Sequence, residues 1–317
     1  MSDPHRSATA ASPATPASSG PPASPSSPVH ATPPAQPAPA AHTQTDPWAR
    51  LRAFTRARIA LGRAGHAQTT ETILAFGLAH AQARDAVHLP LAVEAIEAGL
   101  RAAGLASVRV HSAAVDRQHY LRRPDLGRQL DAASAARLAA IERAQTPVAA
   151  GVAAGSQHRV EGHARGPAHG PDVVFVIADG LSALAAQRHA LPLLAAVRAR
   201  LRDWHIGPVV VAEQARVALG DDIGARLGAR QVVMLIGERP GLSSPDSLGI
   251  YLTYAPRPGR TDAERNCISN VRAEGLSYAR AADRLVFLLR GAVALGRSGV
   301  DLKDDSAAPE ALPPAGA

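Results

Sequence analysis

Three short runs of apolar, mostly β-branched residues constrain the fold of this chain more than any other feature. They are VVFVIA at 173–178, VVVA at 209–212 and VVMLI at 232–236, and segments with helical spacing of apolar residues separate them. Strands that are apolar throughout and alternate with helices are typical of a parallel sheet covered on both faces. We therefore expect residues 171–304 to form an α/β domain, a Rossmann-like three-layer parallel sheet.

The region 47–144 is expected to be mainly helical. Asp46 is a candidate N-cap, and Pro47 suits the first turn of the helix that follows it. Periodic apolar residues that end at glycine or proline predict helices at 48–62, 69–88, 90–105 and 126–144, with a short strand near 107–114.

Three segments lack the periodicity of folded structure. Residues 1–46 are mainly Pro, Ala, Ser, Thr and Gly, which cannot bury enough apolar surface to offset their ordering entropy, so we expect a disordered tail. Residues 145–170 gain glycine and histidine and are expected to form a linker or surface insertion. Residues 305–317 are expected to be a flexible C-terminal tail.

The cysteine content and the hydropathy of the chain indicate where in the cell the protein is expected. Cys267 is the only cysteine, so no intrachain disulfide can form, which suits a reducing cytoplasm. No run of eighteen apolar residues is present, and the N-terminus lacks a basic segment followed by an apolar one. We therefore expect a cytoplasmic protein with no membrane partner.

The formal net charge of +7 and the pI of about 10.5 raise the possibility of nucleic-acid binding. The arginines are scattered, however, and they seldom lie beside the few aromatic residues, so no stacking platform for a single strand is present. We therefore expect no nucleic-acid partner.

Polar residues and glycines follow each of the three apolar runs, at 179–182, 213–214 and 237–241. In open parallel sheets, ligands bind beyond the carboxyl ends of the strands, near the topological switch point. Glu238 and Arg239 alone could form a solvated pair worth at most ~1 kcal/mol. Three such strand ends at one sheet edge favour a binding site.

Two other groups of residues are candidate functional sites. Cys267 could be a nucleophile, but no histidine lies near it in the sequence, so a buried and inert cysteine is preferred, with Ser269 or Asn270 as a cap or turn residue. His80 and His88 share a helical face, where a metal site is conceivable.

Arg84 lies between these two histidines, beside Asp85, and its positive charge opposes metal binding. We therefore interpret this face as polar surface turned toward another subunit. The sequence contains no GxGxxG after a strand, no P-loop, no HExxH and no GxSxG, so it indicates a binding fold without a self-contained catalytic signature, and we expect no metal ligand in it.

Five segments together resemble the small (light) subunit of ethanolamine ammonia-lyase, in the order found in that family. They are FTRARIALGRAGHAQTTETILAFGLAHAQARDAVHLPL, VIADGLSA, LGARQVVMLIGERPGLSSPDSLGIYLTYAPRPG, ERNCISNVRAEG and SGVDLKD. The similarity covers residues 47–304, nearly all of the chain that is expected to be ordered.

The resemblance implies one subunit of an adenosylcobalamin-dependent lyase that converts ethanolamine to acetaldehyde and ammonia by radical chemistry. In that family a large TIM-barrel subunit carries the substrate-binding and most catalytic residues, and the cobalamin lies between the subunits. The resemblance thus implies a hetero-oligomer with the large subunit, no activity of this chain alone, and packaging of the cytoplasmic enzyme in a bacterial microcompartment.

The resemblance also implies cobalamin contacts at Val217, Glu238 and Cys267. Glu238 would accept hydrogen bonds from amide side chains of the corrin, Val217 would supply an apolar wall, and the small Cys267 would allow close approach. DWHIG at 203–207 is one residue short of DxHxxG, and the family keeps dimethylbenzimidazole on cobalt, so His205 is expected to be incidental.

Two other classes of protein are alternatives. A stand-alone Rossmann-like protein that binds a nucleotide or S-adenosylmethionine predicts glycine-rich phosphate contacts after the first strand, yet ADGLSA has a single glycine. An interaction protein with a basic docking surface predicts strongly salt-dependent binding to a shell or a nucleic acid.

Overall fold

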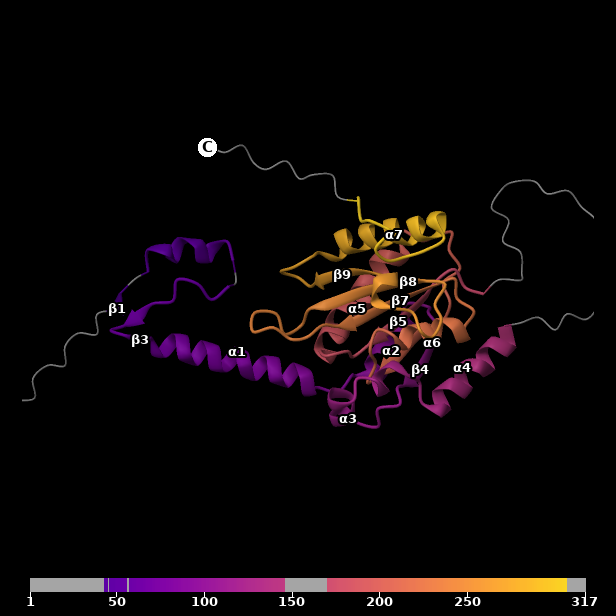
Figure 1. The fold of residues 1–317 in the computed structure, drawn as a ribbon, viewed down its shortest axis with the longest axis horizontal. Helices are drawn as coiled ribbons and strands as arrows, with labels where there is room; N and C mark the ends of the chain where they lie inside the picture. The colour runs from indigo at the N-terminus through magenta and orange to yellow at the C-terminus, as the bar shows by residue number, and fades with distance from the viewer. Residues whose placement is uncertain (1–42, 45, 56, 146–169, 307–317) are drawn as a thin grey trace, which may run out of the picture. The chain divides into compact units, whose positions relative to one another are not determined.

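The computed structural model describes residues 43–44, 46–55, 57–145 and 170–306 (Figure 1). Most of the predicted N-terminal tail, the linker and the C-terminal tail therefore lies outside the described residues.

A six-stranded sheet organises the larger part of the described chain. Its spatial order is β4 (Ser107–His111), β6 (Val209–Glu213), β5 (Val174–Ala178), β7 (Gln231–Gly237), β8 (Leu248–Tyr254) and β9 (Arg265–Val271). The first four strands are parallel, and β8 and β9 are antiparallel to their neighbours. The fold is thus mixed α/β with a mostly parallel sheet, and the three predicted apolar strands are confirmed.

Helices cover both faces of this sheet (Figure 1). One apolar cluster lies against α2 (Val93–Ala102), α5 (Ala183–Arg198) and α7 (Tyr278–Leu295); the other lies against α4 (Ala132–Gln145) and α6 (Leu219–Arg226). Strand β5 is buried at every residue because its side chains alternate between the two clusters. Each large apolar side chain buried in this way contributes roughly 1.5–3 kcal/mol.

Strand β4 comes from the region predicted to be mainly helical, and it pairs with β6 as an edge strand of the sheet. Along the chain β4 follows α1 (Thr70–His88) and α2, and it precedes α3 (Arg117–Arg122) and the 3₁₀ helix η2 (Leu126–Arg128). The region 47–144 therefore contributes one strand to the same sheet as the chain beyond residue 170.

The predicted helix over 48–62 is wrong. Asp46 does cap a helix, since its side chain accepts the Trp48 N–H, but this helix is the 3₁₀ helix η1 (Pro47–Ala53). Leu51 and Phe54 on its apolar face are exposed, so no tertiary packing supports a longer helix.

A small antiparallel sheet accompanies η1 instead of the helical continuation. It consists of β1 (Thr43–Gln44), β2 (Arg63–Ala64) and β3 (Ala67–Gln68). No helix in the described part of the chain is long and apolar enough to cross a membrane.

Candidate functional site

The three polar strand ends meet at one edge of the sheet, as predicted. Strands β6, β5 and β7 are parallel neighbours, so their carboxyl ends adjoin. The chain passes from β5 to β6 on one side and then to β7 on the other, which places the topological switch point between the loops after β5 and β7.

Backbone atoms fill the switch point itself. Gly180 has a φ of +54°, and a Cβ on it would lie 2.2 Å from the Gly237 carbonyl oxygen. The Leu181 N–H donates to that same oxygen at 2.9 Å. Only glycine allows this approach of the two loops, so a ligand has to bind beside the switch point.

Asp179 uses both carboxylate oxygens to hold the loops after β5 and β6. One oxygen accepts the Gly180 and Ala215 N–H groups at 2.8 and 3.0 Å; the other accepts the Gln214 N–H at 2.9 Å and Arg117 Nη1 at 3.3 Å. Burial raises the pKa of Asp179 to about 6, although these donors oppose the shift. Asp179 therefore positions loops within the protein.

Glu213, at the end of β6, belongs to a surface ion-pair network. Its carboxylate accepts a hydrogen bond from Arg109 at 2.7 Å, and Arg109 also binds Glu94 at 3.0 Å. The Arg109 side chain is 45% exposed, so the network is solvated and contributes little to stability.

Glu238 follows β7 and keeps one carboxylate oxygen available. Its Oε2 accepts hydrogen bonds from the Ser247 hydroxyl and, at 3.4 Å, from the Asn270 N–H. Its Oε1 has no hydrogen bond recorded within the described residues, and a Cβ on Gly249 would lie 3.1 Å from it. Glu238 therefore keeps an oxygen that can accept a ligand donor and, unlike Asp179 and Glu213, forms no ion pair with an arginine among the described residues.

Cys267 is exposed, which corrects the expectation that it is buried. It lies in β9, an edge strand whose apolar Ile268 packs against the α7 side of the sheet, and no strand had been predicted there. The Cys267 sulfur is 3.3 Å from the Ser269 hydroxyl oxygen. Ser269 and Asn270 lie within β9 rather than in a cap or turn, and the φ of +63° at Asn270 falls where the pairing of β9 with β8 shifts register.

Tyr251 joins Cys267 and Glu238, and sequence reasoning missed it. It pairs with Cys267 across β8 and β9. Burial raises the pKa of Tyr251, and the neighbouring Cys267 thiol and Glu238 carboxylate raise it further. The phenol is therefore neutral near pH 7. The sequence pattern that could have identified Tyr251 is its position between Ile250 and Leu252, because alternate residues of a strand point to opposite faces of the sheet.

Val217 shares a sheet face with Tyr251, because both pack against the apolar cluster beneath α6. Asp221 on α6 and Arg265 on β9 form a buried bidentate ion pair, with N–O distances of 2.6 and 2.7 Å. This pair ties α6 to the strand that carries Cys267. The structure thus brings Glu238 and Cys267 together with Tyr251 at the β7–β9 end of the sheet, and it places Val217 before α6, against the same apolar cluster as Tyr251.

The other candidates lie elsewhere. His80 and His88 are exposed on α1, where Arg84 and Asp85 form a loose pair at 3.9 Å. No cluster of three or more His, Cys, Asp or Glu side chains suited to a metal occurs within the described ranges. His205 is exposed in the loop before β6, at the amino edge of the sheet, opposite Glu238.

Comparison with known proteins identifies one protein family over most of the chain. The family model "Ethanolamine ammonia-lyase light chain (EutC)" matches residues 45–303. The chain is 54% identical over 266 residues to the ethanolamine ammonia-lyase small subunit of Ralstonia nicotianae, covering 83% of this chain and 90% of that protein.

Two further small subunits of ethanolamine ammonia-lyase are similarly close. The protein from Azotobacter vinelandii is 54% identical over 263 residues, covering 82% of this chain and 89% of the relative. The protein from Pseudomonas aeruginosa is 53% identical over 263 residues, covering 82% and 88%. The chain belongs to the ethanolamine ammonia-lyase light-chain family.

Proposed function

We propose that this chain is the cobalamin-contacting small subunit of an adenosylcobalamin-dependent ethanolamine ammonia-lyase. The complex converts ethanolamine to acetaldehyde and ammonia, and a large subunit carries the catalytic groups, so this chain is inactive alone. The observation that supports the cofactor role best is the face formed by Glu238, Tyr251 and Cys267, which retains an acceptor oxygen and an exposed small side chain.

The residues of this face suit a corrin, which is a broad ring with apolar faces and amide side chains. Glu238 Oε1 accepts an amide N–H, the neutral Tyr251 hydroxyl donates or accepts, and half-buried Val217 supplies apolar contact. Cys267 lets the ring approach β9 closely. When bound, adenosylcobalamin supplies the radical chemistry, whereas this chain binds, orients and shields it from water.

The closed switch point favours cobalamin over the nucleotide-binding alternative. A dinucleotide or S-adenosylmethionine site of the Rossmann type needs an open glycine-rich turn after the first strand. Here Gly180 and Gly237 press their backbones together at that place. We propose that the Rossmann-like sheet uses its carboxyl edge beside β7, in a cytoplasmic complex, with packaging in a bacterial microcompartment as a further expectation.

The proposal is tested by mixing purified chain with ethanolamine ammonia-lyase large subunit and adenosylcobalamin, then removing free cofactor. Corrinoid absorption and ethanolamine turnover are measured for the mixture and for each chain alone. We expect retained corrinoid and turnover in the mixture only. Full turnover by the large subunit without this chain, or no turnover by the mixture, would refute the proposed function.

A further inference from the structure

The first half of α1 is largely exposed within the described residues. Ile73–Leu78 is an unbroken run of six exposed residues, and Leu74 is 68% exposed. Six consecutive helical residues point in every direction around the helix axis. Upstream, Trp48 and Phe54 are also exposed, Phe54 by 86%. Apolar residues gathered in this way mark an interaction surface.

The second half of α1 is held by the rest of the chain. Ala79 and Ala86 are buried, and Arg117 Nε donates to the Val87 carbonyl oxygen at 2.6 Å. A helix that is apolar on all sides normally lies in a protein interior. The exposed stretch is therefore suited to contact with another polypeptide. We refer to residues 46–55 and 57–78 as the N-terminal arm.

The charge of the N-terminal arm indicates the charge of the partner surface that would bind it. The arm carries four arginines and only two carboxylates, Asp46 and Glu71. The arginines are Arg50, Arg52, Arg58 and Arg63. A second copy of this chain, whose formal net charge is +7, is repelled by this arm. An acidic partner surface with apolar patches is complementary to it.

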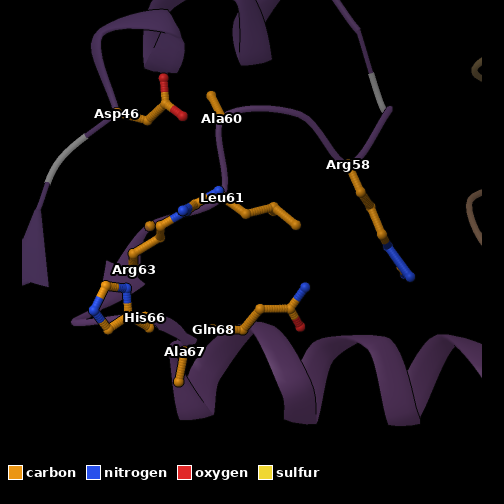
Figure 2. Close-up of a pocket in the computed structure, with 9 residues that line it drawn as sticks. Asp46, Arg58, Ala60, Leu61, Arg63, His66, Ala67 and Gln68 are labelled. Carbon is orange, nitrogen blue, oxygen red and sulfur yellow. The ribbon is translucent and has the colours of Figure 1, made fainter.

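A hollow of about 370 Å³ in the N-terminal arm supports an acidic partner (Figure 2). Arg58, Leu61, His66 and Gln68 line it, together with Asp46, whose carboxylate caps η1. The Arg58 guanidinium carbon lies 5.3 Å from the Phe76 ring centre.

Arg58 Nη1 is buried and has no hydrogen-bond partner among the residues that the structure describes. A buried guanidinium N–H without an acceptor is costly. A carboxylate from a partner surface would supply the missing acceptor, and apolar partner side chains would cover Phe76 and the helix around it.

We propose that the N-terminal arm is the docking surface for the large subunit, through an acidic patch that receives Arg58 and apolar side chains that surround Ile73–Leu78. This inference rests on the proposed function, because that function names the partner. It also explains why the arm carries apolar residues that the chain itself leaves exposed.

The test uses the full chain co-produced with the large subunit, with assembly measured by size-exclusion chromatography and light scattering. Leu74→Glu keeps a good helix former and places an acid against the acidic patch. Leu295→Glu makes the same change at an exposed position of α7 and is the matched control. Arg58→Gln removes the charge and leaves a shorter polar side chain.

We expect Leu74→Glu and Arg58→Gln each to weaken assembly by about tenfold or more, as central interface residues do, whereas Leu295→Glu assembles like the unmodified chain. Assembly should also weaken as salt rises. Helix content by circular dichroism should stay unchanged in all three variants.

Equal assembly of Leu74→Glu and the unmodified chain would overturn the arm proposal while leaving the proposed function intact. A dimer of this chain alone that Leu74→Glu abolishes, with unchanged binding to the large subunit, would show that a second copy occupies the arm. Failure of the unmodified chain to assemble at all would overturn the proposed function and, with it, this inference.

Discussion

Glu238 differs from the other two strand-end acids in that no arginine among the described residues pairs with its carboxylate. Both oxygens of Asp179 are used by backbone donors and Arg117, and Glu213 is engaged by Arg109. Two of the three carboxylates at this sheet edge are thus neutralised by arginines of the chain itself, and Glu238 is the one proposed to bind a ligand. This division follows from hydrogen-bond partners that the sequence does not display.

Glu238→Ala should lower the affinity of the assembled complex for adenosylcobalamin. Loss of a hydrogen bond to a charged acceptor corresponds to roughly a 10- to 100-fold weaker binding. Spectroscopic titration of the complex measures the affinity. Glu213→Ala, at the end of β6 on the same sheet edge, is the matched control and should bind the cofactor normally; equal affinities of the two variants would contradict the assignment.

Asp179 should give the chain a recognisable pH dependence of stability. Burial raises its pKa from the ordinary 3.8 to about 6, so the folded state holds the proton more tightly than the unfolded state. The resulting stabilisation is complete below about pH 4 and is lost as the pH rises to about 6.

Urea unfolding of the chain and of Asp179→Asn between pH 4 and 7 isolates this contribution. The free-energy difference between them should shift by on the order of 2 kcal/mol across the window and then stay flat. Asp179→Asn should also be less stable above pH 6, because its amide faces backbone N–H donors. A difference independent of pH would show that Asp179 does not titrate there.

At the scale of elements, the Asp221–Arg265 ion pair holds the candidate site together. It links α6, which follows Val217, to β9, which carries Cys267, and both side chains are 2% exposed. Arg265 also donates to the Thr253 hydroxyl on β8. The guanidinium fork is the part of arginine that lysine cannot reproduce.

Arg265→Lys should therefore destabilise the chain by about 2–4 kcal/mol, somewhat less than complete removal of a buried partner. Arg226→Lys is the matched control, because Arg226 pairs with Asp222 on the same helix but is 37% exposed. That change should cost about 1 kcal/mol or less. Urea unfolding at pH 7 measures both; similar losses would argue against a special role for the buried pair.

Elements with a strong apolar period could be predicted from sequence, and those set by tertiary contacts could not. The helix over 69–88 and the three apolar strands were predicted nearly at their observed bounds. Strand β9 was missed because RNCISNV alternates weakly and needs β8 as its partner. The predicted helix over 48–62 is wrong because Leu51 and Phe54 on its apolar face are exposed among the residues that the structure describes.

The candidate site could be predicted only in part, because some of its residues are set by the local sequence pattern and others by tertiary contacts. Glu238 stood out at a strand end, whereas the exposure of Cys267 and the place of Tyr251 depend on the antiparallel β8–β9 pair. Val217 and Cys267 came from the family resemblance, since neither residue type signals binding by itself.

For the whole molecule, two surfaces are available to other components of a lyase complex. One is the face that carries Glu238, Tyr251 and Cys267, proposed for cobalamin; the other is the basic and apolar N-terminal arm, proposed for the large subunit. Both surfaces would be covered in the complex. This agrees with a chain whose proposed role is to bind and position the cofactor against the large subunit.

Alkylation of Cys267 in the assembled complex tests the cobalamin-contacting face most directly. Cys267 is the single cysteine of this chain, so mass spectrometry of the chain reports one site without ambiguity. Comparing the complex with and without bound adenosylcobalamin separates cover by the cofactor from cover by the large subunit. We predict that bound cofactor slows alkylation by at least about tenfold, as expected for a thiol removed from solvent. An unchanged rate in a complex that retains its cobalamin would contradict a cofactor site at this face.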